Sequence, residues 1–265
     1  MKKKVIILEC TEYEKDLIYK KIEEGIKLLE SKNSPKKILI KPNMLSARIP
    51  EESVTTHPSV LSAIIEIFRD RKIIIGDSPA GMTIPIEKYW EKCGYKELAK
   101  KYRVGLKKFE ESIPLEIIIK ERKIIVPITS FIKEYSILNV PKFKTHNLTT
   151  LTLGIKNLYG LIPGIKKSLL HTQFISSYDF SVFLIEFYKK IEDKISLTVV
   201  DGIIGMEGNG PSSGKLRNIG YIIIGEKPID VDYVCCKLVG IEPERLDFKK
   251  IYIDKYEFSE PEIIG

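Results

Sequence analysis

The sequence predicts an α/β protein with a mostly parallel, Rossmann-like sheet covered by helices and an inserted β-hairpin. Short apolar runs alternate with amphipathic stretches along the first hundred residues, as strands alternate with the helices that cover them. Two isoleucine-rich runs, 115–119 and 123–128, flank Glu121-Arg122 and predict the hairpin. No repeat or linker-like stretch divides the chain. Residues 1–265 are therefore expected to form one compact unit, or two interlocked lobes.

Each remaining element follows from its local pattern. Strands are expected at 5–8, 38–40, 73–75, 136–140, 195–200 and 219–224. Helices are expected at 13–29, 58–69, 85–101, 180–192 and 231–239. Pro58 falls in the first turn of its helix, a position that favours proline. Tyr252 and Ile253 suggest an added edge strand near the end of the chain.

Composition narrows the class of protein. The hydrophobic share of 43% and the charged share of 30% are ordinary for a globular protein. The first apolar run is too short for a signal peptide and is interrupted by Glu9. No stretch approaches the roughly 20 apolar residues of a membrane span. We therefore expect a soluble, cytoplasmic protein.

The net charge of +7 does not by itself indicate a nucleic-acid partner. Only seven of the 43 basic residues are arginine, the side chain that nucleic-acid readers use for bidentate contacts. The Lys/Glu/Ile-rich composition with a single glutamine, Gln173, is typical of proteins adapted to heat.

The four cysteines, Cys10, Cys93, Cys235 and Cys236, include no C-x-x-C pair. The sequence thus offers no ligand framework for an iron–sulfur cluster or a structural zinc ion in this chain. We expect all four to be buried packing residues.

Polar residues follow several predicted strands. Lys41-Pro42-Asn43, Gly76-Asp77-Ser78, the run 141–146 and Asp201-Gly202 each stand at a carboxyl end. Ligands bind at that edge in open α/β sheets, so these residues predict a binding site. The alternative is local: Asp77 and Ser78 could cap a helix, and Asn43 could hold a turn.

The stretch 135–178 contains no acidic residue, although about six would be expected at the chain's average frequency. It holds basic and imidazole side chains: Lys142, Lys144, Lys156, Lys166, Lys167, His146 and His171. Segregated positive charge interrupted by glycines suits phosphate or carboxylate recognition. The alternative is a basic surface patch.

Histidines are the first candidates for proton transfer. His57, His146 and His171 all have polar neighbours, and Asp77 or Asp201 could orient an imidazole. A metal held by these groups stays open, because their separation follows no ligand-spacing rule.

A glycine-rich stretch, 201–214, follows the strand at 195–200. Its backbone amides could approach a ligand closely. The stretch also contains Glu207 and Asn209, and Glu207 could act as a base or a metal ligand. It matches neither a Walker loop nor a dinucleotide fingerprint. The alternative is a long turn.

Taken in order, these pieces resemble the domain-of-unknown-function family 362 over residues 38–242. The motifs are Lys41-Pro42-Asn43, Thr55-Thr56-His57-Pro58, Gly76-Asp77-Ser78, Lys142 with Lys144-Thr145-His146, Gly154-Ile155-Lys156-Asn157-Leu158-Tyr159-Gly160, Lys167 with His171, Asp201-Gly202 through Pro211, and Asp230-Val231-Asp232. The resemblance implies no agreed reaction. Many members carry an added ferredoxin-like iron–sulfur module, so a redox role here would need a separate ferredoxin-like or redox partner.

A looser likeness links Lys156, Lys167 and His171 to the lactate racemase group, whose sites combine lysines and histidines around a hydroxy acid. This likeness is an analogy between residue types.

The leading hypothesis is an enzyme that performs acid–base chemistry on a small anionic metabolite. The candidate catalytic residues are His57, His146, His171, Asp77 and Asp201. The candidate substrate-binding residues are Lys41, Asn43, Lys142, Lys144, Lys156, Asn157, Lys167, Glu207 and Asn209. The alternative is a non-catalytic partner in an iron–sulfur, redox or cofactor-assembly system. The sequence identifies no cofactor.

Overall fold

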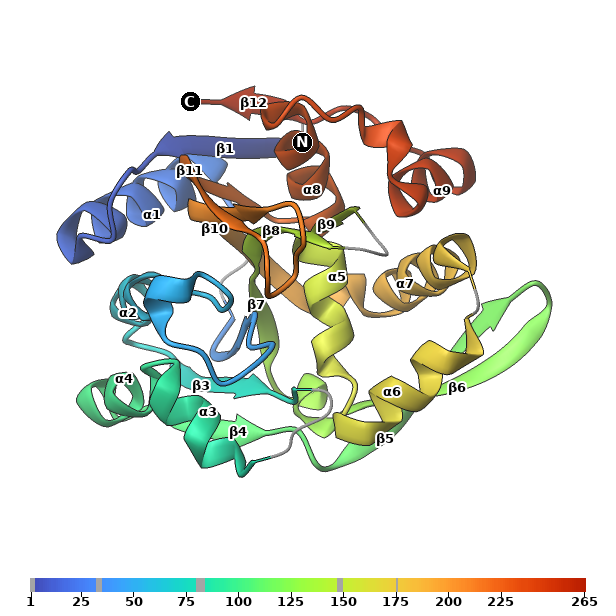
Figure 1. Cartoon of the computed structure of the whole chain (residues 1–265), viewed down its shortest axis with the longest axis horizontal. Helices are drawn as coiled ribbons and strands as arrows, with labels where there is room; N and C mark the ends of the chain where they lie inside the picture. The colour runs from blue at the N-terminus through green and yellow to red at the C-terminus, as the bar shows by residue number, and fades with distance from the viewer. Residues whose placement is uncertain (1–2, 32–34, 80–83, 147–149, 175) are drawn as a thin grey trace.

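A large mixed sheet runs through the computed structural model, which describes residues 3–31, 35–79, 84–146, 150–174 and 176–265 (Figure 1). The main path of this ten-stranded sheet has the order β12-β1-β11-β10-β7-β2-β3-β4, and β8 and β9 extend it beside β10. The strands are β1 (Lys4–Glu9), β2 (Lys37–Pro42), β3 (Lys72–Asp77), β4 (Gly105–Lys108), β7 (Ser136–Val140), β8 (Lys142–His146), β9 (Thr150–Thr152), β10 (Ile195–Glu207), β11 (Lys215–Gly225) and β12 (Glu262–Ile264).

The centre of the sheet is parallel. Strands β10, β7, β2, β3 and β4 pair parallel to their neighbours in that order. Antiparallel β11 joins this block to β1. The parallel block places the carboxyl ends of β2, β3 and β7 at one edge, so the expected fold class is confirmed.

Helices cover both faces of the sheet (Figure 1). They are α1 (Lys15–Leu29), α2 (Pro58–Ile67), α3 (Ile86–Lys92), α4 (Tyr95–Tyr102), α5 (Gly154–Leu158), α6 (Gly164–Gln173), α7 (Ser177–Ile191), α8 (Pro228–Leu238) and α9 (Asp247–Lys255). Side chains alternate between the two faces along a strand, so β2 contributes Leu39 to the core under α5, α7 and α8, and Ile38 and Ile40 to the core under α1 and α2.

Local chemistry sets several helix boundaries. The Glu14 carboxylate accepts hydrogen bonds from the backbone amides of Asp16 and Leu17 at the start of α1. Pro58 opens α2 as expected. The helix expected at 85–101 is two helices, because Gly94 between α3 and α4 adopts a left-handed φ of 76° that a continuous helix would not allow.

The inserted hairpin is confirmed: strands β5 (Ser112–Ile119) and β6 (Arg122–Thr129) pair antiparallel and form a two-stranded sheet of their own. The expected edge strand needs correction, because Tyr252 and Ile253 lie in helix α9 and residues 262–264 form the strand beside β1. The pattern also missed β4, β8, β9 and α5, which are three to five residues long, and the ten-residue α6.

A buried carboxylate ties the C-terminal part of the chain to α5. Asp232 in α8 accepts hydrogen bonds from the amides of Gly154, at 2.7 Å, and Ile155, at 3.0 Å. These are the first two residues of α5, whose amides have no partner within the helix. Burial raises the pKa of Asp232 to about 6. The position of α5 therefore depends on α8.

We expect Asp232→Ala to lower the free energy of unfolding by about 2–4 kcal/mol, because it leaves two buried amide donors without an acceptor. Asp232→Asn keeps one acceptor oxygen and should lose less. Urea unfolding measures both changes. The control Asp193→Ala removes an exposed carboxylate and should cost under about 0.5 kcal/mol; equal losses for Asp232→Ala and Asp193→Ala would contradict the expectation.

Candidate functional site

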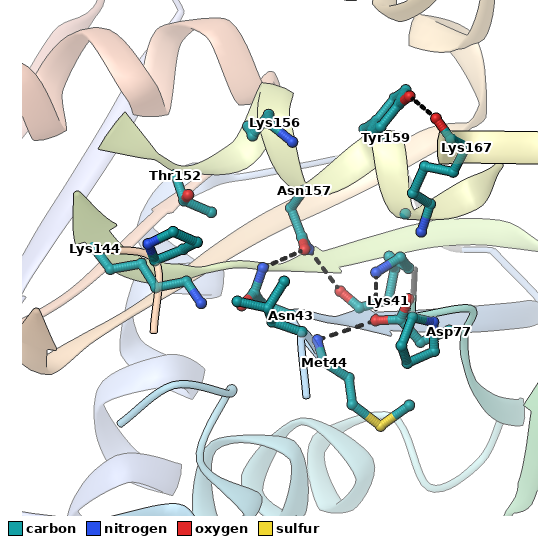
Figure 2. Close-up of a pocket in the computed structure, with 14 residues that line it drawn as sticks. Lys41, Asn43, Met44, Asp77, Lys144, Thr152, Lys156, Asn157, Tyr159 and Lys167 are labelled. Atoms are coloured by element: carbon teal, nitrogen blue, oxygen red, sulfur yellow. Dashed lines mark hydrogen bonds and ion pairs between the residues drawn. The ribbon is translucent and has the colours of Figure 1, made fainter. Parts of the chain in front are cut away.

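A cavity of about 400 Å³ opens at the carboxyl ends of β2 and β3. Side chains from separate parts of the chain line it (Figure 2). They are Lys41, Asn43, Met44, Leu45, Asp77, Pro79, Lys144, Thr152, Lys156, Asn157, Tyr159, Gly160, Lys167 and Pro211. Four of these residues are lysines and one is a carboxylate. The cavity thus joins two strand ends to the acid-free stretch, with α5 above it.

An ion pair between Lys41 and Asp77 forms the floor of the cavity. The Lys41 Nζ lies 2.7 Å from the Asp77 carboxylate, and both side chains are buried. Asp77 also accepts hydrogen bonds from the backbone amides of Met44 and Ser78. Burial lowers the pKa of Lys41, and the charge of Asp77 opposes that shift. Asp77 therefore holds the ends of β2 and β3 and the chain after each of them.

A chain of amide side chains fixes the orientation of Asn43. Asn139 donates to the Gly154 carbonyl, so its oxygen is left to accept from the Asn157 amide at 2.8 Å. The Asn157 Nδ2 also donates to the Lys41 carbonyl, and the Asn157 oxygen accepts from the Asn43 amide at 3.2 Å. Asn43 Oδ1 is therefore left as an acceptor, and it is buried without a hydrogen-bond partner among the described residues.

Three further lysines line the cavity without a carboxylate partner among the described residues: Lys144, Lys156 and Lys167. Burial lowers the pKa of Lys144 to about 7, and the charges of Lys142 and Lys156 act in the same direction. Burial also lowers the pKa of Lys167 to about 7 and that of Lys156 to about 8. Lys144 donates to the Val54 carbonyl at 2.6 Å, and Lys167 to the Ser78 carbonyl.

Two candidate site residues belong to a second buried cluster. Lys142 lies 2.9 Å from the Asp201 carboxylate, which also accepts from the Tyr13 hydroxyl at 2.8 Å. Neither Lys142 nor Asp201 lines the cavity. The pair is fully buried and holds β8 against β10, so we assign it a positioning role.

His57 belongs to the same cluster. Its backbone amide, not its ring, donates to Asp201, at 2.8 Å. The imidazole stacks on Tyr13 at 3.7 Å between ring centroids, and its Nδ1 accepts from the Ser59 amide. Burial lowers the pKa of His57 to about 4. The His57 ring does not line the cavity, and its expected role in proton transfer stays a prediction.

The other candidates fall in different places. The backbones of His146 and His171 lie in β8 and α6, and their side chains lie outside the described part of the structure. Glu207 and Asn209 are exposed and do not line the cavity, because β10 carries the chain past it into solvent. The same loop returns Pro211 to the cavity wall.

Sequence reasoning did not name Thr152, Tyr159 or Gly160 as site residues. Thr152 lines the cavity, and its Oγ1 is buried without a hydrogen-bond partner among the described residues. Gly160 leaves room for the ion pair, since a Cβ there would lie 2.6 Å from both Cε and Nζ of Lys41. Tyr159 and Gly160 both carried a signal, because they end the 154–160 motif.

Among the described residues, no group of three or more His, Cys, Asp or Glu side chains could hold a metal ion. Among the same residues, no helix combines the length and the apolar character needed to cross a bilayer.

We expect Gly160→Ala to displace Lys41 from Asp77 and to lower the melting temperature, because the added methyl group overlaps the lysine side chain. Gly105→Ala is the matched control, since a Cβ there meets its nearest atom at an ordinary 3.5 Å. Thermal unfolding of the two variants tests this; a Gly160→Ala protein as stable as Gly105→Ala would refute it.

Stability should rise with pH through the range in which the buried lysines lose their protons. Their pKa values are near 7 to 8 in the folded protein and 10.5 when unperturbed, so the folded state binds fewer protons than the unfolded state between pH 7 and 10.5. The free energy of unfolding therefore increases as pH rises from about 7 to about 9. Above that range the buried thiols, whose pKa values burial raises, oppose the increase because they keep their protons longer in the folded state. Urea unfolding at several pH values measures it. Lys144→Met should flatten the rise, whereas exposed Lys166→Met should not; a fall in stability would contradict the lysine assignment.

Comparison with known proteins places the chain in a family. A curated thylakoid-associated protein of Synechocystis sp. is 28% identical over 219 residues, which are 78% of this chain and 64% of that protein. A Thermotoga maritima crystal structure shares the fold with a TM-score of 0.54 and 15% identity, covering 87% of this chain and 60% of that one.

The lactate racemase apoprotein from Thermoanaerobacterium thermosaccharolyticum also shares the fold, with a TM-score of 0.55 at 15% identity over 88% of this chain and 56% of that chain. The chain thus spans less than two thirds of the length of each relative. The model of the domain of unknown function DUF362 matches residues 38–237. The chain belongs to the DUF362 family.

Proposed function

We propose that this protein is an enzyme that binds a small anionic metabolite, a carboxylate or a phosphate ester, in the lysine-lined cavity. The observation that carries the proposal is the imbalance of charge. Lys41 is paired with Asp77, whose charge also acts on Lys167, while Lys144, Lys156 and Lys167 line the same cavity without an ion pair of their own among the described residues.

Burying a charge without a counter-ion is costly, and a lysine in that position tends to lose its proton. The lowered pKa values of Lys144 and Lys167, both about 7, express this cost. An anion in the cavity would supply the missing counter-charge and restore the ammonium forms. Binding of an anion in the cavity is therefore expected to be favourable and to be accompanied by proton uptake by the lysines.

Polar groups beside the lysines would orient the bound molecule. Asn43 and Thr152 line the cavity, and the Asn43 Oδ1 and Thr152 Oγ1 atoms are buried without hydrogen-bond partners among the described residues. Such groups hydrogen-bond when a ligand supplies the matching atom. Amines with pKa values near neutrality can give and accept protons at physiological pH. Acid–base work is thus assigned to the cavity lysines rather than to His57.

The similarity to the lactate racemase apoprotein supports the fold alone at 15% identity and names no substrate for this chain. The alternative role in a redox or cofactor-assembly system gains no support from the cysteines. All four are buried, and burial raises their thiol pKa values.

We expect inorganic phosphate or a small carboxylate to raise the melting temperature and to bind more tightly as pH falls from about 9 to 7. The sign follows from proton uptake by Lys144 and Lys167, whose pKa values lie near 7 in the empty protein. Calorimetric titration in two buffers of different ionisation enthalpy measures the protons taken up.

Lys144→Met or Lys167→Met should weaken anion binding at least about tenfold, equivalent to roughly 1.4 kcal/mol. The control Lys166→Met removes an exposed lysine of the same helix as Lys167 and should leave binding unchanged. Equal effects from buried and exposed lysines would indicate diffuse surface attraction and would exclude the cavity as the site.

A further inference from the structure

Lys156 differs from the other lysines of the cavity. Lys41 pairs with a carboxylate, and Lys144 and Lys167 donate to backbone carbonyls. The Lys156 Nζ has no hydrogen-bond or ion-pair partner among the described residues. It stands over two aromatic rings, 4.9 Å from the centroid of Tyr159 and 5.3 Å from that of Phe180.

In Figure 2, Lys156 lies above Asn157, with Lys144 to one side and Lys41 and Lys167 to the other. Its charge acts on both Lys144 and Lys167, and the charge of Lys41 acts on it. Lys156 as a residue is intermediate between buried and exposed, and it lines a cavity that opens to the surface, which gives an incoming molecule a route to it. An amine held among cations and without a polar partner is in the setting that activates lysine as a nucleophile.

We propose that Lys156 forms an imine with an anionic carbonyl compound, such as a 2-oxo acid, whose carboxylate is held by the neighbouring lysines. This inference rests on the proposed anion site and adds a chemical class of substrate to it.

The step balances without an oxidant or a reductant. The nitrogen lone pair of the neutral Lys156 amine adds to the carbonyl carbon and opens the C=O π bond; the nitrogen then loses one N–H proton and the oxygen takes up one proton to give a carbinolamine. The hydroxyl group takes up a second proton and leaves as water while the nitrogen lone pair forms the C=N bond, and loss of the second N–H proton gives the neutral imine. Lys144 and Lys167 are placed to supply and receive these protons, since both line the cavity with Lys156.

Burial supports this role because it keeps a large fraction of the amine neutral near pH 8, where the pKa of Lys156 lies. The exposed neighbour Lys166, whose Nζ donates to the Ser112 hydroxyl, lies on α6 outside the cavity. It therefore serves as an internal reference for unassisted reaction.

The test is reductive trapping at pH 8. The full chain is incubated with pyruvate or glyoxylate and quenched with borohydride, which converts an imine into a stable secondary amine. Intact mass then gives the number of adducts, and peptide mapping gives their positions. We expect one adduct per chain on Lys156, at least about tenfold more than on Lys166, and suppression of that adduct by inorganic phosphate.

Lys156→Met should abolish the specific adduct, and Lys166→Met should not. If Lys156→Met fails to fold, mapping of the wild-type protein still decides the question. Phosphate stabilisation without an adduct on Lys156 overturns the imine while leaving the anion site intact. Adducts confined to exposed lysines, together with no stabilisation by any anion, overturn both proposals.

Discussion

The ion pair between Lys41 and Asp77 is the contact on which the rest of the site depends. Both groups are buried at the ends of adjacent parallel strands, and Asp77 also accepts amides from the segments that follow β2 and β3. Removing either partner would leave an uncompensated charge inside the protein. The ion pair thus fixes the geometry of the cavity floor. Asp77 neutralises the charge of Lys41, and the proposed ligand would interact with the other lysines of the cavity.

The chemistry of the cavity follows from what surrounds this floor. A glycine at position 160 admits the Lys41 side chain, and the amide chain through Asn157 aligns the polar wall. The remaining lysines approach from β8, α5 and α6. Burial and mutual repulsion lower the pKa values of these lysines. The proposed anion would raise those of the lysines that contact it, while the proposed imine requires Lys156 to stay neutral.

The sequence predicted β2, β3, β7 and the start of β10 in the parallel block, because short isoleucine-rich runs alternate there with amphipathic helices; it missed the four-residue β4. It also pointed to Lys41, Asp77 and Lys156, which stand at strand ends or in the acid-free stretch. The sequence could not distinguish residues that belong to the same motif but lie in different parts of the folded structure. Lys142 and Lys144 are two positions apart in β8, yet the first pairs with Asp201 and only the second reaches the cavity. That division depends on the packing of β8 against β10, which no local pattern encodes.

The capping of α5 by α8 has a consequence for how the protein is made. The amides that open α5 receive their acceptor from a residue 78 positions further along the chain. During synthesis, the N-terminal strands and the lysines of β8 leave the ribosome long before this carboxylate. A nascent chain can therefore pair its first parallel strands early, but the cavity takes its final shape only after α8 has emerged and docked.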